Sequence, residues 1–141
     1  MKKFLSVVAL GAFLFSSTAV AAQKEGLNVV LTSGNQQTQM MAMVLSMMTV
    51  KAKKKVNITM CAEGGKLALK STKTKVFEPA KKSPTMLLNA LIKKGANVSV
   101  CPLYLPSVGK DKAALIDGIK VAKPPKIAAQ LLNENFTTLS Y

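Results

Sequence analysis

The stretch SPTMLLNALIKKGANVSVCP (83–102) decides the fold, because it contains a helix, a turn and a strand in direct succession. Its opening Ser-Pro pair is typical of an N-cap followed by the first helical residue, and Gly95 is typical of the position just past a helix end. The segment 96–101 carries β-branched residues and predicts a strand. That strand has to end at Cys101, because the proline after it cannot continue the hydrogen bonding of a central strand.

Strand-like and helical segments also alternate outward from this stretch. On the N-terminal side, residues 27–32 predict a buried strand, 36–53 a helix and 56–61 a second strand. Residues 66–82 are rich in lysine and threonine and show no clear pattern. On the C-terminal side we expect a short helix over 111–117, a strand over 118–123, a helix over 124–133 and a strand over 137–141.

This alternation predicts a mostly parallel sheet with both faces covered, because parallel neighbours are joined by crossover helices. We therefore expect an α/β protein: a single three-layer α/β/α domain over residues 22–141, with a mostly parallel sheet of about five strands. The length suits one domain with one hydrophobic core.

The first 21 residues have the pattern of a signal peptide. Lys2 and Lys3 precede an apolar run over 4–15, and residues 19–21 have the A-x-A form of a cleavage site. The apolar run is too short to cross a bilayer as an anchor. We therefore expect export to the periplasm, removal of residues 1–21, and no stable membrane insertion of the mature chain.

The charged residues are unbalanced: 20 lysines stand against 6 acidic residues, the formal net charge is +14, and arginine, histidine and tryptophan are absent. Without histidine, Ser-His and Cys-His catalytic pairs and histidine metal ligands are excluded. Without arginine there is no bidentate fork for phosphate or guanine, and the few aromatic residues offer no base-stacking platform. We expect no cofactor, no metal and no nucleic acid partner, and lysine clusters such as 51–55 should be solvated faces.

A candidate ligand loop follows the first predicted strand. Open parallel sheets bind ligands at the carboxyl ends of their strands. Ser33, Gly34 and Asn35 lie there and lead into a helix N-terminus, whose backbone amides can hold an anion. The alternative is an ordinary turn between a strand and a helix, which has the same residue types.

The chain has two cysteines, Cys61 and Cys101, and each ends a predicted strand at this same edge. If the two strands are neighbours, the Cα atoms lie about 5 Å apart, within disulfide range; with a strand between them the distance is about 10 Å. The strand order is open, so the pair can be a disulfide, buried apolar residues or reactive thiols. Lys110 and Lys112 could fold over Cys101 and favour its thiolate, whereas Glu63 opposes a thiolate at Cys61, so Cys101 is the more reactive candidate.

Methionines crowd the helix expected over 36–53, and Met40, Met43 and Met47 share one of its faces. Thioethers in an exported protein can bind Cu(I). A helix that packs on a sheet uses methionine as core packing, which is the interpretation we favour.

Three segments resemble the DsrE/DsrF-like proteins: LNVVLTSGNQQTQMMAMVLSMM (27–48), VNITMCAEGG (56–65) and SPTMLLNALIKKGANVSVCPLYLPSVG (83–109). The resemblance implies a three-layer α/β/α domain that often assembles into homo-oligomers. In some members it also implies relay of sulfur, as a cysteine persulfide, between partner proteins. The sulfur-bearing cysteine of those members falls on Cys101.

The resemblance has two departures. Many relatives carry a second cysteine where this chain has Tyr104, and relatives often carry asparagine where it has Cys61, so no family role transfers to that thiol. The predicted function is a periplasmic sulfur carrier or sulfurtransferase-type relay that uses a single persulfide on Cys101, with a sulfur-donor or acceptor protein as partner. The alternative is a non-catalytic oligomeric binding module whose cysteines are structural, as a disulfide or as buried thiols.

Overall fold

The structure is a computed structural model that describes residues 23–141, so the predicted signal peptide over 1–21 lies outside the described residues. Within the described part, five strands form one sheet in which every neighbouring pair is parallel. The strands are β1 (Gly26–Leu31), β2 (Lys55–Met60), β3 (Asn97–Val100), β4 (Lys120–Val121) and β5 (Phe136–Ser140), in the sheet order β4-β3-β2-β1-β5. The predicted α/β class is confirmed.

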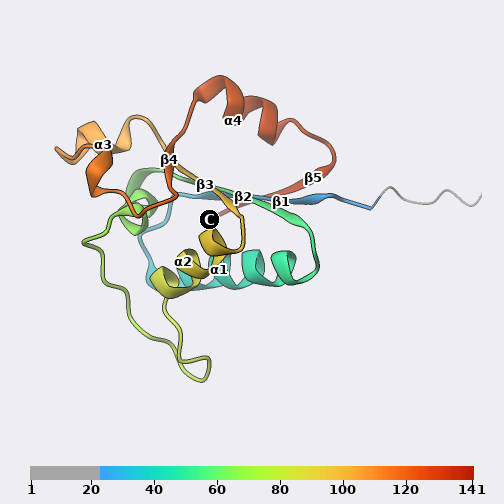
Figure 1. The fold of residues 1–141 in the computed structure, drawn as a ribbon, viewed down its shortest axis with the longest axis horizontal. Helices are drawn as coiled ribbons and strands as arrows, with labels where there is room; N and C mark the ends of the chain where they lie inside the picture. Colours follow the sequence, from blue (N-terminus) through green and yellow to red (C-terminus); the bar gives the residue numbers. More distant parts are fainter. Residues whose placement is uncertain (1–22) are drawn as a thin grey trace, which may run out of the picture.

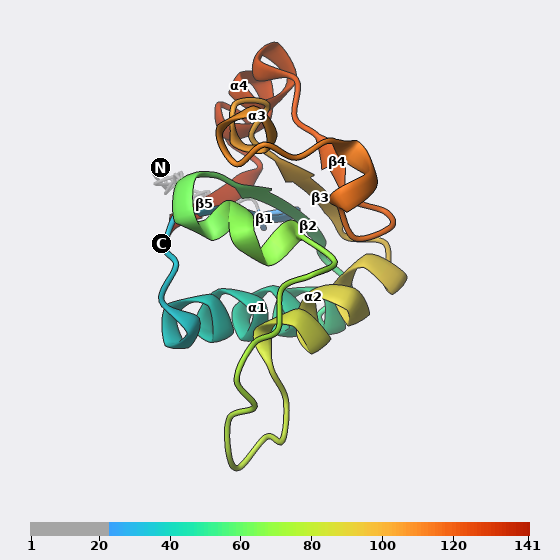
Figure 2. The same cartoon turned by 90° about the vertical axis from the view of Figure 1, so that its left-hand side faces the viewer.

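Helices cover both faces of the sheet, which gives the three layers seen in Figure 1 and, from the carboxyl edge of the strands, in Figure 2. The helices are α1 (Gln36–Lys51), α2 (Pro84–Lys93), α3 (Tyr104–Ser107) and α4 (Pro124–Leu131), with two 3₁₀ segments, η1 (Ala62–Ala68) and η2 (Lys112–Ala114). α1 and α2 pack on one face, and α4 lies over the other with α3 on the same side. Across residues 23–141, no helix has both the length and the apolar character needed to span a bilayer.

The stretch over 83–102 folds as its sequence predicts. The Ser83 hydroxyl accepts the backbone N–H of Met86 at 3.3 Å and caps α2, whose first residue is a proline. Gly95 follows the helix with a φ of 86°, a conformation that favours glycine, and the chain then enters β3.

The face of the sheet toward α1 and α2 is apolar and forms the core. Alternate residues of the three central strands are buried there: Leu27, Val29, Leu31, Val56, Ile58, Met60, Val98 and Val100. Met43 and Met47 of α1 belong to the same core, and Met40 is also buried. The methionine face of α1 is therefore core packing, as expected.

The opposite face of the sheet carries polar residues under α4. Asn97 donates its side-chain amide to Asn57 at 3.2 Å, and Asn57 donates to Asn28 at 2.9 Å. Asn28 in turn donates to the Gln130 carbonyl of α4 at 2.8 Å and has no exposed surface. This asparagine ladder gives buried polar groups their partners and ties three strands to α4.

The C-terminal half differs from the sequence expectation in its detail. The strand expected over 118–123 shrinks to the two residues of β4, because Gly118 adopts a φ of 92° and turns the chain. The helix expected over 111–117 is the single turn η2, capped by the Asp111 carboxylate. Residues 69–83 contain no named helix or strand and form the loop that projects past α1 and α2 in Figure 1.

Candidate functional site

The two cysteines lie side by side at the carboxyl edge of the sheet. Parallel strands bring their carboxyl ends to one edge, and Cys61 and Cys101 directly follow β2 and β3. These two strands are neighbours, with Met60 paired to Val100 in the register, so the cysteines are the next residues beyond that pair. The strand order that the sequence left open therefore brings the two thiols together.

Backbone hydrogen bonds continue one residue past the strands and fix both cysteines. The Cys61 N–H donates to the Leu31 carbonyl at 2.9 Å, and the Cys101 N–H donates to the Met60 carbonyl at 2.8 Å. Neighbouring strands are about 4.8 Å apart, which lies within the Cα separation that a disulfide spans. Both residues are free cysteines in the structure.

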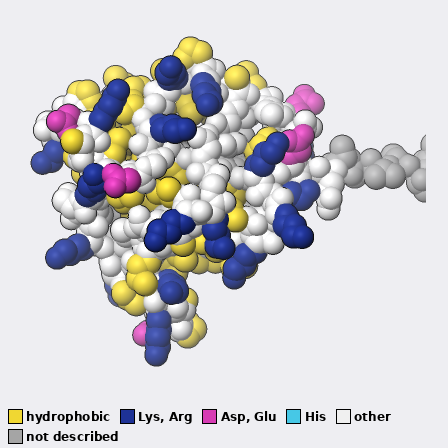
Figure 3. Space-filling model, viewed as in Figure 1, with side chains coloured by type: hydrophobic (Ala, Val, Ile, Leu, Met, Phe, Trp, Pro, Cys, Tyr) yellow, Lys and Arg dark blue, Asp and Glu magenta, His cyan; other side chains and the backbone are white. Residues whose placement is uncertain are grey.

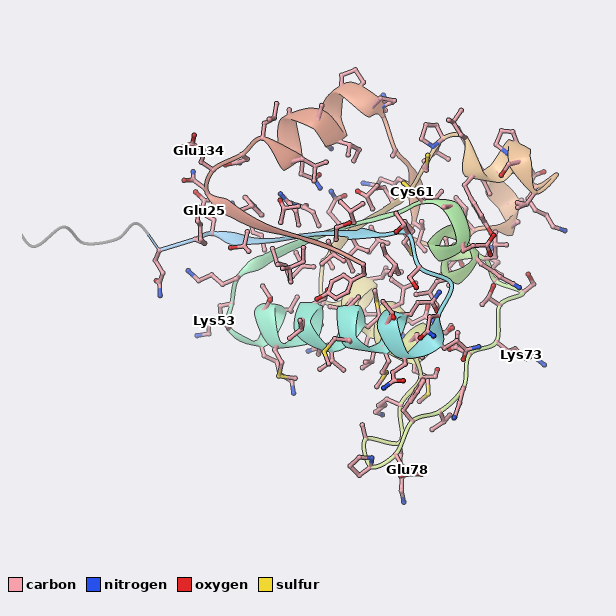
Figure 4. All side chains as sticks on the ribbon, turned by 180° about the vertical axis from the view of Figure 1, so that it is seen from behind. Glu25, Lys53, Cys61, Lys73, Glu78 and Glu134 are labelled. Carbon is pink, nitrogen blue, oxygen red and sulfur yellow. The ribbon has the colours of Figure 1, made fainter. Side chains whose placement is uncertain are left out.

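The two thiols are partly buried and lie close enough for Cys101 to influence the protonation of Cys61. Cys61 lies near the end of the sheet that is remote from the N-terminal trace in Figure 4. Burial and, to a smaller extent, the neighbouring Cys101 thiol raise the pKa of the Cys61 thiol to about 11. Cys61 therefore keeps its proton at neutral pH.

Two adjacent glycines hold the turn that follows Cys61. The Gly64 N–H donates to the Thr32 carbonyl at 2.9 Å, and the Gly65 N–H donates to the Cys61 carbonyl at 3.2 Å. A Cβ on Gly64 would lie 2.3 Å from the Leu31 carbonyl oxygen, so the turn presses against the end of β1 at a distance that only glycine permits.

Tyr104 joins the turn after Cys101 to the turn after Cys61. Its N–H donates to the Cys101 carbonyl at 3.0 Å, and its ring packs against Gly65, where a Cβ would lie 2.6 Å from the ring. Burial and the charge of Glu63 raise the pKa of the Tyr104 hydroxyl. The available signal was an aromatic residue one turn after Cys101, together with the Gly-Gly pair after the second strand.

The candidate loop of Ser33, Gly34 and Asn35 is a helix cap. The Asn35 side chain accepts the N–H groups of Gln37 at 2.9 Å and Thr38 at 3.1 Å. The Ser33 N–H donates to the Tyr141 carbonyl at 3.2 Å. These bonds hold the loop as a turn that begins α1. An anion-binding role for the loop stays a prediction.

Lys110 and Lys112 lie beyond Cys101 in an open pocket. They line it together with Pro102, Leu105 and Pro106, and its volume is about 530 Å³. Cys101 is not part of the lining, although the pocket begins at the residue after it. A contribution of these lysines to the thiolate of Cys101 stays a prediction. Elsewhere lysines are spread over the face in Figure 3 and form no single patch.

The chain belongs, by its sheet order and layers, to a class of three-layer α/β/α domains with known structures. The ychN protein from E. coli has a TM-score of 0.69 at 15% sequence identity, over 84% of this chain and 99% of that one. The protein of unknown function MTH1491 from Methanobacterium thermoautotrophicum has a TM-score of 0.59 at 12% identity, over 82% of this chain and 99% of that one.

At these identities the likeness shows that this chain shares its fold with both solved structures. No family model and no curated protein sequence matches the chain.

Proposed function

We propose that this chain is a member of the DsrE/DsrF-like family that carries sulfur as a persulfide on Cys101. The shared fold over most of the chain supports the family, and the sequence resemblance assigns the sulfur-bearing position to Cys101. The observation that carries the proposal is the position of Cys101: a free, half-buried thiol at the carboxyl end of an interior strand.

The chemistry needs a nucleophilic thiol and no histidine base. The Cys101 thiolate attacks the terminal sulfur of a persulfide on a donor protein, the sulfur–sulfur bond of the donor breaks, and the donor cysteine leaves as a thiol. The product is a persulfide on Cys101. An acceptor thiol then removes the same sulfur atom, so the carrier undergoes no net oxidation.

Cys101 is the better nucleophile of the pair. The thiolate is the reactive form of cysteine, and the pKa of about 11 at Cys61 leaves that residue almost entirely protonated at neutral pH. The open pocket that begins at Pro102 provides apolar surface beside Cys101 where part of a partner protein can dock.

The proposal extends to location and partners. Residues 1–21 direct export, so the donor and acceptor proteins are periplasmic, and the mature chain assembles with copies of itself. The export segment lies outside residues 23–141, and its role rests on its sequence pattern.

Two single-thiol variants test the carrier function. Cys61→Ser keeps only Cys101, and its matched control Cys101→Ser keeps only Cys61. After incubation with inorganic polysulfide and removal of the excess, the intact mass of Cys61→Ser should rise by about 32 Da, and dithiothreitol should reverse the rise, whereas two added oxygens of similar mass on cysteine or methionine would resist it. A Cys61→Ser protein without this reversible gain, or an equal gain in Cys101→Ser, would overturn the assignment to Cys101.

A further inference from the structure

The second thiol gives the carrier a way to discharge its sulfur. We propose that Cys61 resolves the persulfide of Cys101: Cys61 gives its proton to the outer sulfur, its Sγ attacks the Cys101 Sγ, a Cys61–Cys101 disulfide forms, and the outer sulfur leaves as hydrosulfide. This step rests on the proposed persulfide and adds an activity to it, the reduction of a carried sulfur atom to sulfide.

The reaction balances within the pair. The proton of Cys61 first moves to the outer sulfur of the Cys101 persulfide, which makes Cys61 a thiolate and the outer sulfur a better leaving group. The bond between the two Sγ atoms then forms, the bond between the Cys101 Sγ and its outer sulfur breaks, and the outer sulfur departs with the proton as hydrosulfide. The outer sulfur is reduced, and the two cysteine sulfurs are oxidised to the disulfide.

The backbone already holds the two residues at the separation that the product needs. β2 and β3 lie in the interior of the sheet, and their last paired residues are Met60 and Val100. The Cys101 N–H extends this pairing by its bond to the Met60 carbonyl at 2.8 Å. Closing the bridge therefore requires rotation of the side chains and no movement of the strands.

The thiols are also neighbours before the reaction. Each cysteine directly follows one member of the Met60–Val100 pair, so the attacking group lies on the strand next to the sulfur it attacks. Both cysteines are partly exposed to solvent, so the released hydrosulfide has a route out of the site. The turn at Gly64 and Gly65 and the ring of Tyr104 fix the backbone on either side.

The product disulfide returns to the dithiol by exchange with an external dithiol protein, which supplies the two electrons that the sulfur consumed. Each cycle thus takes one sulfur atom from a donor and releases one sulfide.

The test compares wild type with Cys61→Ser after identical polysulfide loading and removal of the donor under argon. In Cys61→Ser the persulfide should persist. In wild type its lifetime should be shorter by at least roughly tenfold, because the resolving thiol belongs to the same molecule. Free sulfide, trapped with monobromobimane, should appear in a one-to-one ratio with the loss of about 2 Da relative to the dithiol that marks the disulfide.

The outcomes separate this step from the carrier function. If Cys61→Ser takes up no sulfur, the carrier function fails, and this step fails with it. If Cys61→Ser takes up sulfur but the wild-type persulfide survives equally long and no disulfide forms, the carrier function stands and the resolving step is wrong. A disulfide without its equivalent of sulfide would also contradict the step, because it would come from direct oxidation.

Discussion

The raised pKa of Cys61 should slow its reaction with alkylating reagents at neutral pH. The thiolate is the reactive species, and the Cys61 pKa of about 11 predicts that its rate rises roughly tenfold per pH unit between about pH 7 and 9. Cys101 should react faster throughout this range. Peptide mass spectrometry of the reduced protein measures both rates, and a plateau at Cys61 below pH 9 or equal slow rates at both sites would contradict this account.

Part of the raised pKa of Cys61 comes from its neighbour, and a substitution can remove that part. Cys101→Ala takes away the influence of the neighbouring thiol but leaves the burial in place. The pKa of Cys61 should fall part of the way toward its ordinary value, and its alkylation at pH 8 should become faster. Cys61 alkylation that is unchanged in Cys101→Ala would show that burial alone sets this pKa.

At the scale of elements, the asparagine ladder joins three strands to α4. Asn57→Ala removes the middle of the ladder. The side-chain oxygen of Asn28 then loses its donor, and the side-chain amide of Asn97 loses its acceptor. We expect the free energy of unfolding to fall by about 1–3 kcal/mol, the cost of unsatisfied buried polar groups. Asn89→Ala is the control, because the side chain of partly buried Asn89 donates only to the Thr85 carbonyl within α2. Urea denaturation measures both, and equal small losses would contradict a structural role for the ladder.

The turn after β2 depends on a close approach between Gly64 and β1. A methyl group at Gly64 would lie 2.3 Å from the Leu31 carbonyl oxygen, and that backbone atom cannot move aside easily. Gly64→Ala should therefore cost about 3 kcal/mol of stability. Gly109→Ala is the control: no atom lies within 4 Å of its added methyl group, and its φ of 61° costs about 1 kcal/mol. Thermal unfolding that ranks the two variants in the opposite order would contradict this packing.

Capping and turn residues in the sequence predicted the helices and strands better than they predicted which of them pack together. The Ser-Pro pair, Gly95 and the proline after Cys101 fix the ends of α2 and β3 within a residue or two of their observed positions. The order of the strands depends on long-range packing, so the adjacency of Cys61 and Cys101 was one of two alternatives. The contact between Tyr104 and Gly65 has the same long-range origin, and the aromatic residue and the Gly-Gly pair do not by themselves show that the two residues meet.

At the scale of the whole molecule, one side of α1 differs from the rest of the chain in having no charged residue. The chain carries a net charge of +14, which repels a second copy, yet the segment 36–50 of α1 contains no charged residue. Its outer side exposes Met41, Leu45 and Met48, whose exposed fractions are 53%, 37% and 48%. We propose this charge-free side of α1 as the contact between copies.

A lysine on that side should weaken the assembly. Leu45→Lys should raise the dissociation constant of the oligomer by at least about tenfold, because a buried contact would acquire an unpaired charge. Val76→Lys is the control, since Val76 is 50% exposed on the projecting loop. Light scattering across protein concentration at low and high salt measures the change, and a wild-type protein that stays monomeric in both would contradict the assembly.

The most direct test of the central claim is to locate sulfur on the protein as cells make it. Cys61→Ser protein, isolated from producing cells and alkylated at once, is digested, and the peptide with Cys101 is examined by mass spectrometry. We expect an alkylated persulfide on Cys101 that dithiothreitol converts to the free thiol. A Cys101 peptide that carries only the alkylated thiol, in cells supplied with a sulfur source, would contradict the claim that Cys101 carries sulfur.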